Sequence, residues 1–291
     1  MSSPISDTAV SLPAPELRPY ITAYAGSRIS GLPPGLHFGL PSSGVDLIIS
    51  LGGPIDVVQM PNASQRPAAF AALVSGLQDA PATVRQGRDV FGLHVFIKPL
   101  GVRALFGVAS AEISSLVLHL SDIWGSRAGD LLEMLAAADS WQRRFNLLDR
   151  AFASTLNPTS PRPEIVWAWQ RLRKSHGAVP IQLLADETGY GRRHFSSRFR
   201  DAIGITPKAA ARVFRFERAC RLIAEKRPSL AYVAMACGYY DQAHLTREWN
   251  ALAGCSPRAW IAHELPFLQD YELGGRDCGV EEVESTHRAF V

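Results

Sequence analysis

The segment between Pro180 and Pro257 contains one pattern twice. The first copy reads IQLLADETGY followed by HF, RFR and IGITP, and the second, about fifty residues later, reads LAYVAMACGY followed by HL, REW and AGCSP. Each copy predicts a short apolar helix, a turn and a second helix, and Gly189 and Gly238 suit the left-handed residue of that turn. Because the pattern lies on a basic stretch, it predicts two helix-turn-helix units that read DNA.

The second helix of each copy is predicted to be amphipathic. Its apolar positions are Phe195, Phe199 and Ile203 in the first copy and Leu245, Trp249 and Leu252 in the second. At about 100° per residue, the side chains farthest from these positions are Arg193, Ser197 and Arg200 in the first copy and Ala243, Arg247 and Asn250 in the second. Ser196 and His194 lie at the flanks of the first apolar face, and Gln242 and His244 lie near the start of the second helix. Arginine can pair with guanine, and asparagine or glutamine with adenine. Both helices are therefore predicted to present base-reading side chains.

A long helix is predicted between the copies, over residues 208–226. At ~1.5 Å per residue it is roughly 28 Å long, comparable with the ~34 Å between successive major grooves on one face of DNA. A rigid connector of this length suits the placement of two recognition helices in adjacent grooves. It carries four arginines, which either contact phosphates or form ordinary surface and intramolecular ion pairs: Arg212, Arg215, Arg218 and Arg221.

Charge is distributed unevenly along the chain. Residues 1–159 carry 11 Lys and Arg against 12 Asp and Glu, residues 160–265 carry 17 against 9, and residues 266–291 carry 2 against 6. A basic domain beside a nearly neutral one is typical of a nucleic-acid-binding domain with a partner domain. The charge alone is equally consistent with a solvated basic surface.

The segment from Ile181 to Trp260 resembles the DNA-binding domain of the AraC/XylS family of transcriptional regulators. The resemblance is carried by GYGRRHFSSRFRDAIGITP, by the RFERACRLI helix and by GYYDQAHLTREWNALAGCSPRAW. It implies a sequence-specific transcriptional regulator of the activator kind, which binds double-stranded DNA in two successive major grooves. It also implies a small-molecule effector, contact with RNA polymerase and a homodimer.

The resemblance also assigns roles to individual positions. The base-contacting places of the family fall on Arg193, Ser196 and Ser197 in the first recognition helix and on Gln242, His244 and Arg247 in the second. Positions for the DNA backbone or its flanks are Arg192, His194, Arg200 and Asn250. His194 and His244 align with each other between the two copies, but only His244 falls at a base-contacting place.

The first half of the chain predicts a separate, β-rich domain with helices, so the fold class is α+β with two domains. Val45, Leu47 and Ile49 alternate as in a strand, and the strand that resumes at Ile55 after a glycine and proline turn predicts a hairpin. Ser140 is placed to cap an amphipathic helix over residues 141–156. The predicted divisions are a sensor or dimerisation domain over 1–156, a linker over 157–163, the DNA-binding domain over 164–268, and an acidic tail, taken as disordered, over 269–291.

The order of strands and helices in residues 1–156 resembles the sensor domains of this family, which are often small β-barrels of cupin type. No cofactor is expected, and no metal site either, because the three histidines of this part, His37, His94 and His119, are isolated in sequence. Five aromatic side chains, Tyr24, Phe38, Phe91, Phe96 and Trp124, could line a ligand cavity, but core packing is the expected use of each. The ligand itself is not indicated by the sequence.

Cysteine usage and hydropathy indicate where in the cell the protein is expected. Cys220 and Cys237 occupy small apolar helix positions and are expected to be buried free thiols, and no C-x-x-C pair occurs among the four cysteines. No apolar run approaches the ~18 residues that span a bilayer, and the first residues lack the pattern of a signal peptide. A cytoplasmic protein without membrane contact is expected.

Two alternatives to a regulator remain open at this stage. One is an enzyme with a DNA-binding appendage, such as a repair methyltransferase, which would need a reactive cysteine that residues 1–219 do not contain. G-x-S-x-G, P-loop and G-x-G-x-x-G motifs are absent from the sequence as well, so no enzyme is expected. The other is an architectural protein that binds DNA without sequence preference; outward Ser and Gln beside Arg favour base readout over charge alone.

Overall fold

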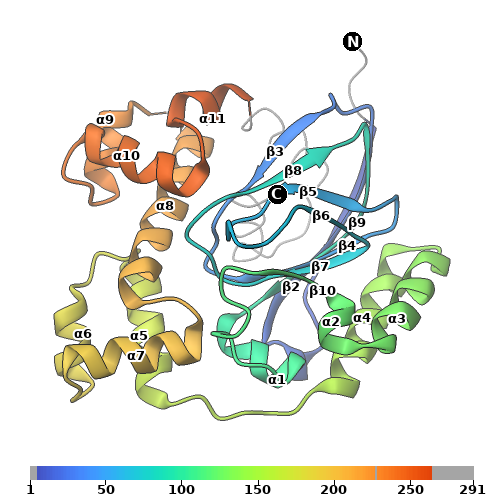
Figure 1. Cartoon of the computed structure of the whole chain (residues 1–291), viewed down its shortest axis with the longest axis horizontal. Helices are drawn as coiled ribbons and strands as arrows, with labels where there is room; N and C mark the ends of the chain where they lie inside the picture. Colours follow the sequence, from blue (N-terminus) through green and yellow to red (C-terminus); the bar gives the residue numbers. More distant parts are fainter. Residues whose placement is uncertain (1–4, 227, 264–291) are drawn as a thin grey trace.

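The chain folds into a β-rich part followed by a helical part, as the computed structural model shows for residues 5–226 and 228–263 (Figure 1). The acidic tail predicted over 269–291, including Cys278, lies outside the described residues. The strands are β1 (Ile5–Ser11), β2 (Ile21–Ser30), β3 (Gly35–Gly39), β4 (Val45–Ser50), β5 (Ile55–Gln59), β6 (Ala68–Phe70), β7 (Ala72–Ser75), β8 (Ala82–Gln86), β9 (Asp89–Ile97) and β10 (Val117–His119). The predicted α+β class with a β-rich first domain is confirmed.

The strands form two sheets that face each other across an internal space. One sheet has six strands in the order β1-β2-β9-β4-β7-β10, and the other has four in the order β3-β8-β5-β6. Strand β4 shows why the two faces of the large sheet differ: Val45, Leu47 and Ile49 are buried on one face, while Asp46 and Ile48 line the internal space on the other. Side chains alternate between faces in a strand, so a period of two predicts this division.

The predicted hairpin between the strands at Val45 and Ile55 is wrong. Strand β4 pairs with β9 and β7 in the large sheet, whereas β5 pairs with β6 and β8 in the small one. Both hydrogen-bonding edges of β4 are occupied by strands from later in the chain, so the turn at Gly52–Pro54 carries the chain across to the other sheet. Sequence pattern located both strands but did not determine their partners.

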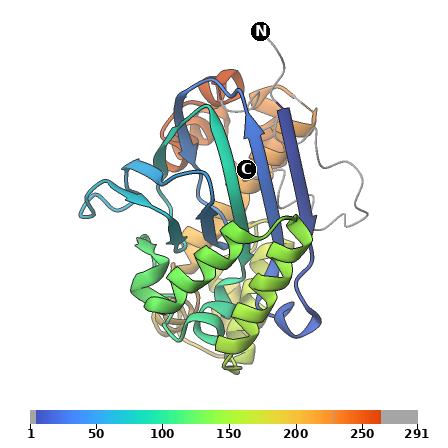
Figure 2. The same cartoon turned by 90° about the vertical axis from the view of Figure 1, so that its right-hand side faces the viewer.

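Helices cover the outer face of the large sheet (Figure 2). They are α1 (Val102–Phe106), α2 (Leu120–Trp124), α3 (Ser126–Ala137) and α4 (Trp141–Thr155), preceded by the short 3-10 helices η1 (Pro15–Leu17) and η2 (Pro99–Gly101). Ser140 caps α4 as expected, because its side chain accepts a hydrogen bond from the backbone N–H of Arg143 at 3.4 Å. Phe145, Leu148 and Phe152 of α4 are buried in the same cluster as Leu47 and Val95 of the sheet. The apolar face of α4 is therefore used within the chain.

Arg144 and Trp141 fix the α3–α4 hairpin on the sheet. The Arg144 guanidinium donates to the backbone carbonyl oxygens of Leu135 and Ala138, where α3 ends, and so satisfies acceptors that a helix end leaves open. The same guanidinium lies 5.1 Å from the ring centroids of both Phe91 and Trp141. The Trp141 ring rests on the backbone of Gly26 in β2, where only a glycine leaves room for it.

The helical part contains both copies of the repeated motif and the long helix between them. Its helices are α5 (Pro163–Lys174), α6 (Ile181–Glu187), α7 (Arg192–Ile203), α8 (Pro207–Lys226), α9 (Leu230–Ala236), α10 (Gln242–Ala253) and α11 (Pro257–His263). The first unit shares one buried cluster with the β-rich part, whereas the second unit has a cluster of its own. The two parts of the chain are thus packed together, although residues 156–162 between them have no regular secondary structure.

Gly26→Ala is expected to destabilise the β-rich part. A Cβ at this position would lie 2.3 Å from Cε3 of Trp141, and such overpacking typically costs about 1 to 3 kcal/mol. Urea unfolding followed by tryptophan fluorescence measures the change. Gly129→Ala is the matched control, since Gly129 lies exposed on α3 with open space around it, and alanine is expected to raise helix stability there by about 0.5 to 1 kcal/mol. Equal unfolding free energies for the two variants would contradict the role of Gly26.

Candidate nucleic-acid interface

The first unit is built from α6 and α7 around a glycine turn. Leu184 on α6 and Phe195 and Phe199 on α7 are fully buried, which holds the two helices together. Gly189 has a φ of 72°, a left-handed conformation that a side chain would strain. The next residue, Tyr190, donates a hydrogen bond from its hydroxyl to the Glu164 carboxylate of α5 at 2.6 Å. The turn is thereby tied to the helix that precedes the unit.

The second unit, α9 and α10, repeats this arrangement with a different helix start. Gly238 takes the place of Gly189 with a φ of 76°. Asp241 then caps α10, because its carboxylate accepts a hydrogen bond from the backbone N–H of His244 at 2.6 Å. In the first unit α7 follows directly on Gly191 and has no side-chain cap. The second turn thus ends in an aspartate that caps its helix, where the first ends in a glycine; the difference between these two N-cap residues is typically only about a few tenths of a kcal/mol.

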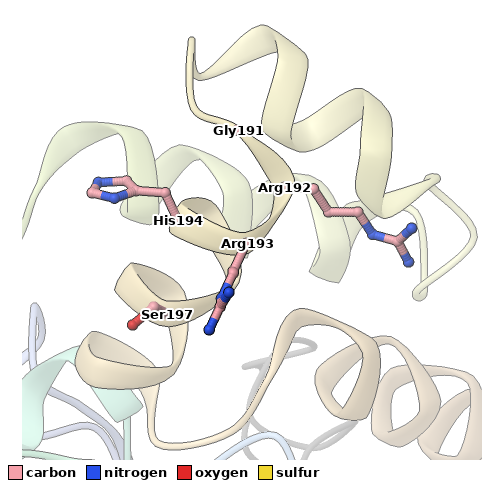
Figure 3. A pocket seen from close by; sticks show the side chains of 5 residues that line it. All are labelled: Gly191, Arg192, Arg193, His194 and Ser197. Atoms are coloured by element: carbon pink, nitrogen blue, oxygen red, sulfur yellow. The ribbon is translucent and has the colours of Figure 1, made fainter.

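Most of the predicted DNA-facing side chains are exposed. The exposed ones are Arg192, Arg193, His194, Ser197 and Arg200 on α7 and Gln242, Arg247 and Asn250 on α10, while Ser196 and His244 are half-buried. Figure 3 shows that Arg193 and Ser197 point to the same side of α7, whereas Arg192 and His194 diverge from them. These four residues and Gly191 line a shallow hollow of about 580 Å³ at the start of α7. Its basic lining suits a phosphate or a base edge.

The two aligned histidines pack against the tyrosines of their own turns. His194 lies on Tyr190 with ring centroids 4.9 Å apart, and His244 lies edge-on to Tyr239 at 5.4 Å. The Nδ1 atom of His244 accepts a hydrogen bond from the backbone N–H of Tyr240 at 3.2 Å. In this structure His244 therefore contacts its own unit, in contrast to the freely exposed Arg247.

Helix α10 is held on α8 by charged side chains that face inward. The Glu248 carboxylate lies 3.0 Å from Nε of Arg212 and 3.8 Å from Arg215, both on α8. The Arg215 guanidinium also lies 5.6 Å from the Tyr239 ring centroid. Two of the four arginines on α8 thus form intramolecular ion pairs. The sequence had left open whether these arginines form such pairs or contact phosphates. Glu248 was not predicted, although its position one turn after His244 places it on the inner flank of α10.

The connector helix α8 also contacts the β-rich part. The backbone N–H of Ser43, in the loop between β3 and β4, donates to the Glu217 carboxylate at 2.6 Å. The Asp79 carboxylate, in the loop between β7 and β8, lies 3.5 Å from the Arg212 guanidinium. Both loops are far from α8 in sequence, which is why no local pattern predicts these contacts. Helix α8 is the element through which the two parts hold each other.

Comparison with known proteins identifies the helical part. A family model described as a helix-turn-helix domain matches residues 184–263. Residues 184–263 therefore form a helix-turn-helix domain, as the sequence predicted. The matched segment spans the two recognition helices and the connector described above. The remainder of the chain lies outside this match.

Curated relatives share parts of the chain. The MmsAB operon regulatory protein of Pseudomonas aeruginosa is 31% identical over 85 residues, which cover 29% of this chain and 28% of that protein. The thermoregulatory protein LcrF of Yersinia pestis is 28% identical over 171 residues, covering 55% and 58% respectively. The chain thus spans well under two thirds of either relative. A structure of ToxT from Vibrio cholerae covers 88% of this chain and 98% of its own at 9% identity, with a TM-score of 0.49.

The β-rich part encloses a cavity of about 540 Å³ between its two sheets. His94 and Asp46 line it and pair through Nε2 and Oδ1 at 2.8 Å. His94, His37 and His119 were each predicted to be isolated; within residues 5–226 and 228–263, no three His, Cys, Asp or Glu side chains cluster as metal ligands do. Of the five aromatic residues considered for a cavity, Phe91 is among the lining residues, and its ring faces Trp141 at 5.8 Å.

Two further features concern the cysteines and the possibility of a membrane span. Cys220 and Cys237 are buried free thiols, as predicted, and burial raises the pKa of both. In the part of the chain that the structure describes, no helix is long and apolar enough to cross a bilayer.

Glu217 makes the stability of the protein depend on pH. Its carboxyl is buried between α8 and the β-rich part, and burial raises its pKa to about 7, against the opposing effects of the Ser43 hydrogen bond and of Arg221. Because an unfolded glutamate ionises near 4.5, the folded state binds the proton more tightly. This contribution is fully present below pH 4.5 and is lost as pH rises through 7.

Glu217→Gln is expected to remove this dependence. At pH 5 the variant and the wild type should have similar free energies of unfolding, and at pH 8 the variant should be more stable by up to about 3 kcal/mol. Urea unfolding at a series of pH values measures the difference. Glu225→Gln, at an exposed position of the same helix, is the control and should keep the wild-type profile. If the free energy of unfolding changed with pH in the same way for both variants, the pKa of Glu217 would not be raised by burial.

Proposed function

We propose that this protein is a sequence-specific DNA-binding transcriptional regulator. The observation that carries the proposal is the pair of recognition helices, each with a buried apolar face and an exposed polar one, on a basic AraC-type domain. Arg193 and Ser197 on α7 and Gln242 and Arg247 on α10 are the exposed residues best suited to base edges. Ser196 and His244, half-buried in this structure, are base contacts by family position. Arg192, His194, Arg200 and Asn250 are assigned to the DNA backbone and flanks.

The two recognition helices differ in the bases they suit. Arginine pairs well with guanine in both, but only α10 adds an amide side chain, Gln242, which pairs with adenine. A single chain should therefore read an asymmetric site across two successive major grooves, and not a direct repeat. Exposed serine and glutamine beside arginine favour this reading over an architectural protein that relies on charge alone.

The β-rich part is proposed to sense a small-molecule effector. Its cavity of about 540 Å³ lies within the size range of ligand sites in proteins. The relative from Pseudomonas aeruginosa is named an operon regulatory protein, and another, VirF of Yersinia enterocolitica, is named a transcriptional activator. These names support a role in activation. Contact with RNA polymerase and a cytoplasmic location are part of the proposal, and no enzymatic activity is proposed. A homodimer remains a prediction, and it needs a surface other than the apolar face of α4, which is packed inside the chain.

Arg193→Ala and Arg247→Ala are expected to relax base preference at different positions of the bound site. Each loss should cost about 1 to 3 kcal/mol of specific affinity and affect one base pair in its own half of the site. Selection from a random duplex library, followed by sequencing, gives the preferred site of each variant. Arg66→Ala, an exposed arginine of the β-rich part, is the matched control.

Two results would contradict the proposal. One is an unchanged preferred site for both recognition-helix variants. The other is a wild-type protein whose affinity for the selected site equals its affinity for random duplex at every salt concentration, as expected of a binder that uses phosphate charge alone.

A further inference from the structure

The cavity of the β-rich part has a polar end and an apolar wall. The polar end contains Asp46 and His94, whose side chains are 21% and 15% exposed, and Gln78, which is buried. The wall contains Ile48, Ile55, Val57, Leu73, Val84 and Val117. A ligand that fills this space needs an apolar body and a polar head at one end.

The charged side chains of the cavity lining determine which polar head group of a ligand can bind there. The charged side chains of the lining are Asp46, Asp89 and Arg85. Arg85 is more than half exposed and pairs with Asp56 at 2.9 Å, so Asp46 is the charge that a ligand meets at the polar end. A carboxylate only accepts hydrogen bonds. A head that donates hydrogen bonds is therefore favoured at Asp46, and an anionic head is repelled.

His94 reinforces this selection. Its Nε2 atom is used by Asp46 at 2.8 Å, which leaves Nδ1 as the ring nitrogen for a ligand. With Nε2–H donating to Asp46, Nδ1 is left as an acceptor. A hydroxyl can donate to the carboxylate or to Nδ1, and an ammonium can donate to both. A carboxylate or phosphate head can do neither.

The polar end lies next to the two loops that contact α8. Gly39 and Leu40 line the cavity, and the same loop places the Ser43 N–H on Glu217. Gln78 lines the cavity as well, and the next residue, Asp79, is the one that contacts Arg212. Asp46, at the start of β4, accepts a hydrogen bond from the Ser42 hydroxyl of the first loop at 3.4 Å. Cavity and connector helix are thus joined by short backbone segments.

We propose that this cavity binds a small molecule with an apolar body and an uncharged or cationic hydrogen-bonding head, held at Asp46 and His94, and that the loops of Ser43 and Asp79 transmit its binding to α8. The proposal rests on the effector-sensing role proposed above and names the ligand class and the route. Arg212 extends the route to DNA, because it contacts both Asp79 and Glu248 of the recognition helix α10. A shift of the Asp79 loop changes how α10 is held.

The ligand class is tested with three probes that share one apolar body: 4-phenyl-1-butanol, 4-phenylbutylamine and 4-phenylbutyrate. Isothermal titration with the full-length wild-type chain should show that the alcohol and the amine bind at least about tenfold more tightly than the anion. Asp46→Asn should reduce that preference to about threefold or less. Equal binding of alcohol and anion to the wild type overturns the ligand class whether or not the variant folds, and so does the absence of binding by all three.

The route is tested with Asp79→Asn and the control Asp130→Asn, which removes an exposed carboxylate of the same domain, on α3 and outside the cavity lining. Saturating 4-phenyl-1-butanol should change the affinity of the wild type and of the control for the selected duplex by the same factor. The factor should be clearly smaller for Asp79→Asn. Hydrogen exchange of residues 40–44 and 76–81 should change on binding in the wild type.

The outcomes separate this proposal from the proposed function. If the alcohol binds but leaves DNA affinity and exchange unchanged in the wild type, or if Asp79→Asn responds like the control, the route is wrong while DNA recognition stands. If the wild type shows no sequence preference in DNA, the regulatory function fails, and the titration of the three probes still decides the ligand class.

Discussion

The packing of α8 in two buried clusters is the constraint on which the rest of the structure depends. Val213 and Phe214 belong to the cluster shared by the first helix-turn-helix unit and the β-rich part, while Phe216 and Ile223 belong to the cluster of the second unit. One continuous helix cannot move one of these contacts without moving the others, since interiors are close-packed. The spacing of the recognition helices and the docking of the β-rich part are thus set by the same twenty-residue segment.

The two faces of the large sheet have different surroundings. One face is covered by helices and supplies the core, with Leu47 and Val95 completely buried. The other face borders a cavity and carries polar groups such as Asp46 and His94 at some of its positions. Burial on the packed face contributes hydrophobic free energy in proportion to its apolar area, whether or not the other face is completely filled.

Sequence alone predicted what depends on neighbours along the chain. Helical period located the exposed Arg193 and Arg247, and the glycine turns and the Ser140 cap follow from local backbone chemistry. Contacts between distant segments were not predictable in this way. Asp46 and His94 meet because β4 and β9 are adjacent strands, and Glu217 is buried because a loop from the other domain covers it. The hairpin predicted between β4 and β5 was wrong for the same reason. The alternation of apolar residues indicates that a segment is a strand, but it does not indicate which other strand it pairs with.

Different helix starts and different anchoring contacts distinguish the two reading units. Helix α10 starts from a capping aspartate and is tied by Glu248 to the connector, whereas α7 starts at a glycine and is tied through its turn to α5. Anyone who wished to redesign the recognised sequence by transplanting one recognition helix into the other position would have to move its turn and its anchoring partners along with it. The duplicated motif is therefore a pair of non-interchangeable parts, and a change of DNA preference is more readily made by substituting exposed side chains than by exchanging helices.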